Sequence, residues 1–117
     1  MFLSLAHKSL HVYAATRELV RAVYTITKLL PAEEKFNMVL QMRRAALSVK
    51  LNLAEGASRR SVAERNRFIE VARGSVVEID AALETACDLG YFKQEQLSAT
   101  GESLNKCFAM LSRMIEQ

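Results

Sequence analysis

The side chains best suited to chemistry in this chain are four arginines that lie close together in the sequence. Arg59 and Arg60 precede a helix-start signature, and Arg65 and Arg67 fall in the first turns that follow it. A cation near the positive N-terminus of a helix costs about a few tenths of a kcal/mol. Free backbone N–H groups and guanidinium groups both suit phosphate. The pattern predicts a nucleic-acid or other anion-binding surface, in which we include the nearby Arg43.

The charge distribution places the basic residues in the middle of the chain. The net charge is +3 over 117 residues. Residues 41–73 carry 8 basic and 3 acidic side chains, whereas residues 74–117 carry 3 basic and 7 acidic ones. The arginine group contains no aromatic residue on which bases could stack, so nucleic-acid binding there would be electrostatic and weakly sequence-specific. An ordinary solvated face is the alternative.

Catalytic and metal-binding patterns are missing from the sequence. His7 and His11 are the only histidines, and they lack a third ligand for a metal site. No nucleophile elbow, glycine-rich phosphate loop or paired-carboxylate motif is present. Cys87 and Cys107 lack metal-ligand spacing and are interpreted as small buried thiols in a reducing compartment. We therefore expect no enzymatic activity, metal or cofactor.

A row of polar residues runs along the segment that ends near Gly56. At about 100° per residue its members lie one turn apart on one side of a helix. Polar groups must be paired if they are covered, so the row predicts a structural network. In this hypothesis Arg44 pairs with a glutamate, while Ser48 and Asn52 bond the next helix or a neighbouring subunit. A small-ligand pocket between the second and third helices is the alternative. The network comprises Gln41, Arg44, Ser48, Asn52 and Glu55.

The same segment has apolar residues on both sides of this polar row. One set is Met38, Val39, Met42, Ala45, Ala46, Val49 and Leu53. The second set is Phe36, Leu40, Leu47, Leu51 and Ala54. A surface helix normally has one apolar stripe, so the second set predicts an interface with another copy of the chain. Cyclic closure would bury it in a homo-oligomer.

The positions of these residues depend on a chain that is predicted to be entirely α-helical. One proline, four glycines and almost no alternating β-branched residues argue against strands. Helices are expected over about residues 8–29, from Glu33 or Glu34 to Gly56, from the Ser61 cap to Gly90, and from about residue 94 to 115. Short loops favour an antiparallel up-down-up-down four-helix bundle, a single domain over residues 1–117.

The expected cores of the last two helices follow from the same spacing. In the third helix, Gly74 and Ser75 suggest a place where two helices approach closely. The predicted third-helix stripe is Phe68, Val71, Ala72, Val76, Ile79, Leu83 and Ala86. The predicted fourth-helix stripe is Leu97, Leu104, Phe108, Leu111 and Ile115.

The sequence contains neither a membrane-span pattern nor a secretion pattern. No apolar run approaches the roughly 18 residues of a membrane span. The apolar start, residues 1–6, is too short for the core of a signal peptide. We expect a cytoplasmic protein with no membrane partner.

Two motifs carry a family resemblance. They are Gln41-x-Arg-Arg-Ala-x-x-Ser-Val-x-x-Asn-Leu-Ala-Glu-Gly56, followed by Arg59 or Arg60, and then Phe68-x-x-x-Ala-x-Gly-Ser-Val-x-Glu78. Over about residues 8–115 the chain resembles the four-helix-bundle proteins whose first members are encoded by intervening sequences in bacterial large-subunit ribosomal RNA genes.

This resemblance implies a small bacterial protein that forms a homopentamer of bundles. A more distant relative, the accessory protein of diversity-generating retroelements, is a basic pentamer that binds its reverse transcriptase and nucleic acid. Most members have no established activity. The present chain is less basic than that relative and has an acidic C-terminal third. We expect a non-enzymatic scaffold or adaptor that binds RNA, DNA or a nucleic-acid-handling protein, or alternatively a purely protein-binding or structural oligomer.

Overall fold

The computed structural model describes residues 1–115, except for the Ser9 side chain, and this part of the chain is all-α. Its four α-helices are α1 (His11–Thr27), α2 (Met38–Ala57), α3 (Val62–Asp88) and α4 (Ser98–Ile115). Three short 3-10 helices, η1 (Ala6–Ser9), η2 (Ala32–Glu34) and η3 (Gln94–Leu97), precede α1, α2 and α4. No strand occurs within these residues. The all-α prediction, with four helices, is confirmed.

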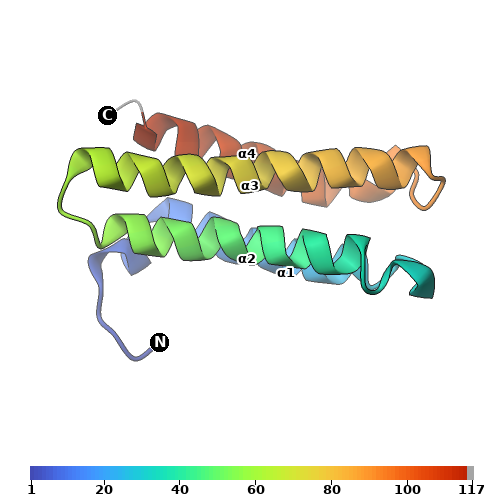
Figure 1. Cartoon of the computed structure of the whole chain (residues 1–117), viewed down its shortest axis with the longest axis horizontal. Coiled ribbons are helices and arrows are strands. Elements are labelled where there is room, and N and C mark those ends of the chain that lie inside the picture. The colour runs from blue at the N-terminus through green and yellow to red at the C-terminus, as the bar shows by residue number, and fades with distance from the viewer. Residues whose placement is uncertain (116–117) are drawn as a thin grey trace.

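The four α-helices lie side by side in an elongated molecule of 45 × 30 × 21 Å (Figure 1). The α1–α2 and α3–α4 connections lie at one end of the molecule. The α2–α3 connection, the start of the chain and the end of α4 lie at the other end. α1 packs against α2 and α4, and α3 packs against the same two helices, with the α2–α3 contact the most extensive. Each helix therefore has two neighbours around one core.

One continuous cluster of apolar side chains fills the space between the helices. The first apolar set of α2 faces this cluster as predicted, with Val39 only partly buried. Full burial of such an aliphatic side chain contributes about 1.5–3 kcal/mol. The largest completely buried side chains include Leu19, Met42, Leu53, Ile79 and Leu111, so all four helices contribute to the core.

The ends of the first two helices differ from the sequence expectation. α1 begins at His11 and ends at Thr27, because residues 6–9 and the segment before Pro31 form tighter turns. α2 begins at Met38 and not at Glu33 or Glu34. Those two glutamates belong to η2, where the Glu34 side chain turns inward. Phe36 thus precedes α2 and is not part of its helical face.

The α3 boundaries follow the predicted local signals. The Ser61 Oγ accepts a hydrogen bond of 3.1 Å from the Glu64 backbone N–H, which caps the first turn. At the other end Gly90 has φ of +80°, a left-handed conformation that favours glycine just after a helix. Both boundaries are therefore set by nearby residues.

The core stripes of α3 and α4 are each displaced by one residue from part of the prediction. Ile69 is buried, while Phe68 is half-buried and Val71 is 49% exposed. In α4, Cys107 is buried and Phe108 is 42% exposed, and Ile115 is half-buried. Helical spacing allowed either of two adjacent residues, such as Phe68 or Ile69, to face the core. The direction in which the neighbouring helices lie decides which of the two is buried.

The close approach of helices occurs at Gly56 and not at Gly74. A Cβ atom on Gly56 would lie 2.9 Å from the Phe68 Cβ and 3.2 Å from the Arg65 backbone oxygen. A Cβ atom on Gly74 would meet nothing within 4 Å. Gly56 also lies inside α2, which continues to Ala57, one residue beyond the predicted helix end. It is the residue that lets α3 start against α2.

Candidate functional site

The polar row of α2 forms a short hydrogen-bond chain to α3. The Ser75 hydroxyl donates to the Ser48 Oγ at 2.8 Å. The Asn52 Nδ2 donates to the Ser48 Oγ and to the Ser48 backbone oxygen, each at 2.9 Å. These groups are partly buried, and pairing them avoids the cost of covering unpaired polar atoms. The Ser48–Ser75 bond therefore connects the two helices, as predicted for Ser48, whereas Asn52 bonds only Ser48 within α2 and not the next helix.

The other members of the polar row face outward. Gln41 and Arg44 are exposed. Within residues 1–115, neither side chain forms a hydrogen bond or ion pair, and no glutamate pairs with Arg44. Glu55 is exposed and pairs with Arg59. The row is therefore linked to α3 in its middle and is open to solvent at Arg44 and Gln41.

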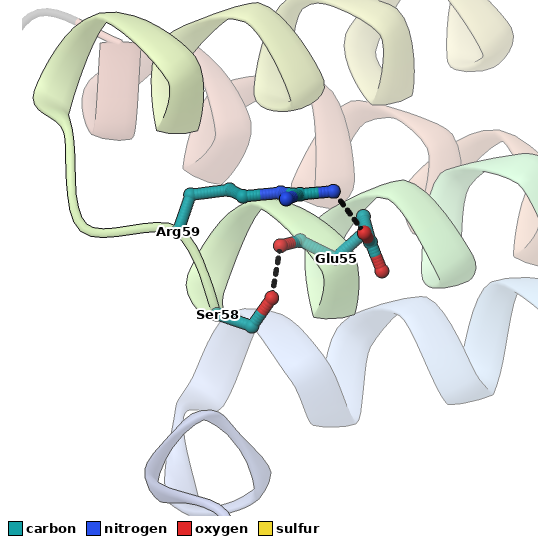
Figure 2. Close-up of polar contacts among 3 residues, drawn as sticks. All are labelled: Glu55, Ser58 and Arg59. Atoms are coloured by element: carbon teal, nitrogen blue, oxygen red, sulfur yellow. Dashed lines mark hydrogen bonds and ion pairs between the residues drawn. The ribbon is translucent and has the colours of Figure 1, made fainter.

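Contacts within a single turn close the end of α2 (Figure 2). The Ser58 hydroxyl donates to the Glu55 backbone oxygen at 2.7 Å. The Arg59 guanidinium pairs with the Glu55 carboxylate and lies 5.0 Å from the centre of the Phe68 ring. A cation above an aromatic ring is attracted by the electrons of its face. Arg59 thus contacts both Glu55 in α2 and the Phe68 ring in α3.

The structure divides the predicted arginine surface into separate parts. Arg59 and Arg67 line one groove between α2 and α3, whereas Arg65 lines another groove with His7, Val62 and Met114. Arg60 lies in the exposed α2–α3 connection. Four of the five arginines therefore surround the α2–α3 junction, but they do not share a single concave surface.

Arg43 stands apart from the other four arginines. Its Nε donates to the Thr27 Oγ1 at 3.0 Å, and one terminal nitrogen donates to the Tyr24 backbone oxygen at 3.4 Å. Its guanidinium also lies 4.6 Å from the centre of the Tyr24 ring. These contacts hold the last turn of α1 against α2. Arg43 is engaged in helix packing in this structure.

A shallow groove of about 410 Å³ lies between α2 and the first turns of α3. Phe68 and Val71 supply its apolar wall, and Asn52, Arg59, Glu64 and Arg67 supply its polar wall. Its volume falls within the range of about 300–1,000 Å³ that is common for small-ligand sites. It occupies the place of the ligand pocket that the sequence offered as an alternative.

The second apolar set remains partly exposed in the single chain. Leu40 and Leu47 are each 38% exposed, and Leu51 is 60% exposed. Ala54 is half-buried, and Phe36 is 82% exposed just before the helix. We call Leu40, Leu47, Leu51 and Ala54 the α2 outer face. Contiguous exposed apolar side chains of this kind often indicate an interaction surface.

A buried carboxylate that the sequence prediction missed joins the two connections at the opposite end of the molecule. Glu34 is only 9% exposed. Its two oxygens accept hydrogen bonds from the Tyr91 hydroxyl at 2.8 Å and from the Asn37 Nδ2 at 3.1 Å. In the sequence, the only indications of this contact were a glutamate shortly after Pro31 and a tyrosine directly after Gly90. Nothing in the sequence pairs Glu34 with Tyr91.

The Tyr91–Glu34 hydrogen bond predicts a loss of stability in alkali. The bond to Glu34, with smaller effects of burial and the Glu34 charge, raises the pKa of Tyr91 from 10.0 to about 12. A group whose pKa is higher in the folded protein than in the unfolded protein stabilises the folded state fully at a pH below its unfolded pKa. This stabilisation is lost as the pH rises through the folded pKa. We expect the melting temperature of the native protein to fall between pH 10.0 and about 12.

Tyr91→Phe tests this expectation because it removes the hydroxyl and keeps the ring. The variant should melt at a lower temperature than the native protein at neutral pH. Its melting temperature should also fall less than that of the native protein between pH 10.0 and about 12. Tyr24→Phe is the matched control, because within residues 1–115 the Tyr24 hydroxyl forms no hydrogen bond to another side chain. If the melting temperature falls equally in the native protein and in Tyr91→Phe over this pH range, the loss of stability does not come from the Tyr91–Glu34 hydrogen bond.

The cysteines and histidines form no cluster in the structure. Cys107 is buried and Cys87 is partly exposed, and both are free thiols. Burial raises the pKa of the Cys107 thiol to about 11. His7 is buried with its ring edge against Tyr13, at a centroid distance of 5.0 Å. Residues 1–115 contain no group of three or more side chains that could hold a metal ion.

None of the described helices is long and apolar enough to cross a membrane.

The fold and site define a small four-helix all-α protein with a polar helix contact, an arginine-bearing junction and a partly exposed apolar helix face. Residues 8–113 match the 23S rRNA-intervening sequence protein family, and the chain belongs to that family. The family resemblance noted from the two motifs is therefore confirmed. No curated protein matches the chain.

A solved structure shares this fold. It is the crystal structure of a protein of unknown function from the S23 ribosomal protein family of Bacteroides thetaiotaomicron VPI-5482. The two chains are 22% identical with a TM-score of 0.82, and the match covers 91% of this chain and 99% of that one. At this level of identity the similarity establishes the fold.

Proposed function

We propose that this protein is a non-enzymatic, cytoplasmic oligomeric adaptor that binds nucleic acid or a nucleic-acid-handling protein, without a metal, cofactor or membrane partner. The observation that carries the proposal is the partly exposed α2 outer face beside an arginine-bearing junction. The first feature suits contact with a second copy, and the second suits a polyanion. Repetition of the arginines around an assembly would strengthen the field that each copy produces.

The proposed assembly is a cyclic homopentamer of antiparallel up-down-up-down bundles. Support for the helix order comes from the connections, which alternate between the two ends of the molecule (Figure 1). Support for the assembly comes from Leu40, Leu47 and Leu51, which remain partly exposed to solvent in the described chain. Light scattering of the purified protein tests the assembly, and a monomer at micromolar concentration would contradict it.

The proposed nucleic-acid surface consists of Arg59, Arg60, Arg65 and Arg67. Arg60, Arg65 and Arg67 are exposed, and within residues 1–115 none of the three forms an ion pair. Arg59 is paired with Glu55, and a phosphate would have to compete for it. Arg43 makes its contacts within the helix packing and would contribute little. Electrostatic contacts of this type release counterions and therefore weaken steeply as salt increases.

A titration of the native protein with structured RNA or DNA tests this surface. Replacing Arg59, Arg60, Arg65 and Arg67 with glutamine should lower affinity by at least about tenfold at low salt. The negative slope of log K against log salt concentration should become shallower by roughly 0.9 for each duplex phosphate contact that is lost. The control variant replaces the exposed Arg17, Arg21, Lys28 and Lys93 with glutamine, which removes the same charge away from the junction.

The outcome separates the proposed function from its alternatives. If both variants lose affinity equally, net charge and not the junction carries the binding. If the native protein binds no nucleic acid at about 50 mM salt, where phosphate contacts are strong, a purely protein-binding oligomer is favoured. Thermal stabilisation by a small metabolite would instead support a ligand in the α2–α3 groove.

A further inference from the structure

A second groove lies between α3 and α4, near the connection that joins them. Its volume is about 680 Å³, within the range that holds sizeable ligands. The buried side chains of Leu83, Leu97 and Leu104 form its apolar floor. The α3–α4 connection lies at the end of the molecule opposite the α2–α3 connection (Figure 1). The groove is therefore separate from the proposed nucleic-acid surface.

The rim of this groove carries only negative formal charge. Asp80, Glu84, Asp88 and Glu102 line it and are exposed, and no lysine or arginine is among the lining residues. Within residues 1–115 the ion pairs formed by carboxylates involve Glu55 and Glu18, so these four have no ion-pair partner. Like charges gathered on one surface repel one another. A cationic occupant would relieve that repulsion.

Gly101 lies at an open place in the α4 wall of the groove. It lies in α4 and lines the groove, and a Cβ atom added to it would meet nothing within 4 Å. Packing within the chain therefore does not require glycine at this position. Glycine is the least favourable residue inside a helix after proline. Its lack of a side chain lets an approaching ligand come close to the α4 backbone.

We propose that the α3–α4 groove binds a cationic amphipathic peptide segment of a protein partner. Lysine or arginine side chains of the segment would meet the acidic rim, and its apolar side chains would lie on the leucine floor. The floor is the reason to favour a peptide over a simple polycation, which has no apolar groups to place there. This inference rests on the proposed adaptor function in one respect, because the peptide in the groove belongs to another protein.

The test is a fluorescence anisotropy titration with a labelled synthetic helical peptide that has lysines on one face and leucines on the other. The rim variant combines Glu84→Gln, Asp88→Asn and Glu102→Gln. We expect it to weaken peptide binding by about tenfold, because three exposed ion pairs together amount to about one order of magnitude in affinity. The control variant, with Glu18, Glu33 and Glu70 replaced by glutamine, removes equal charge outside the groove and should change affinity by less than about twofold.

Gly101→Leu tests the apolar part of the groove without changing its charge. The variant should lose peptide binding while spermine, a cation without apolar side chains, still binds as before. Circular dichroism checks its fold, and the rim variant decides the question if Gly101→Leu does not fold. Absence of peptide binding, equal losses in rim and control variants, or native affinity in a folded Gly101→Leu protein would overturn the proposal.

The same variants separate this proposal from the nucleic-acid proposal. The rim variant should retain the RNA affinity of the native protein, and the variant lacking the four junction arginines should retain the peptide affinity. Failure of RNA binding with intact peptide binding would reject only the proposed nucleic-acid function. Failure of peptide binding with intact RNA binding would reject only the groove.

Discussion

Replacing Gly56 with alanine is expected to destabilise the protein by about 1–3 kcal/mol, the usual cost of adding a methyl group where there is no room. The new Cβ would lie 2.9 Å from the Phe68 Cβ and 3.2 Å from the Arg65 backbone oxygen. Neither atom is the end of a flexible side chain that could swing away. α2 and α3 would therefore have to separate at the most extensive contact between helices in the structure.

Gly74→Ala is the matched control for this prediction, and it should have the opposite sign. Its Cβ would meet nothing within 4 Å, and the backbone there has no positive φ. Alanine is favoured over glycine in a helix interior by about 1 kcal/mol, so this variant should be more stable than the native protein. Urea unfolding measures both changes. A Gly56→Ala protein as stable as the native one would show that the helix contact can adjust without cost.

Replacing Leu47 with glutamate is expected to dissociate the proposed oligomer while leaving helicity largely intact. Leu47 lies on the α2 outer face and is partly exposed in the single chain, so a charge at this position can remain in water in the monomer. In an assembled interface the carboxylate would be covered without a partner, which typically costs several kcal/mol. Light scattering measures the change in mass, and circular dichroism measures the helicity.

Val77→Glu is the control for the Leu47 variant. Val77 is an exposed apolar residue of α3 that lies outside the α2 outer face. The same change in charge there should preserve the assembly. An assembled Leu47→Glu protein would exclude the α2 outer face from the interface. Dissociation by both substitutions would instead mean that the interface extends over α3.

The features that could be predicted from the sequence depend on interactions between residues close together in the chain. Helical periodicity identified the all-α class and the buried face of α2. Ser61 and Gly90 marked the ends of α3, because a cap and a left-handed glycine act within one turn. The two motifs around Ser48 and Phe68 were sufficient to indicate the family.

The start of α2 and the rotation of two core stripes were decided by tertiary structure. The glutamates after Pro31 suit a helix start, but Glu34 turns inward to accept hydrogen bonds from Asn37 and Tyr91. In α3 and α4, adjacent apolar residues such as Phe68 and Ile69 fit the helical period equally well. Which of them becomes buried depends on the direction from which the neighbouring helix approaches.

The candidate site divides in the same way between sequence and tertiary structure. The sequence by itself determined which residues are chemically suited to a role: the arginines, the polar row of α2 and its second apolar set. Only the tertiary structure decided that Arg43 packs against Tyr24, that Gly56 and not Gly74 permits the close approach, and that Glu34 meets a residue 57 positions away. Local signals arise within a turn or two of helix, whereas these contacts depend on where separate helices meet in space.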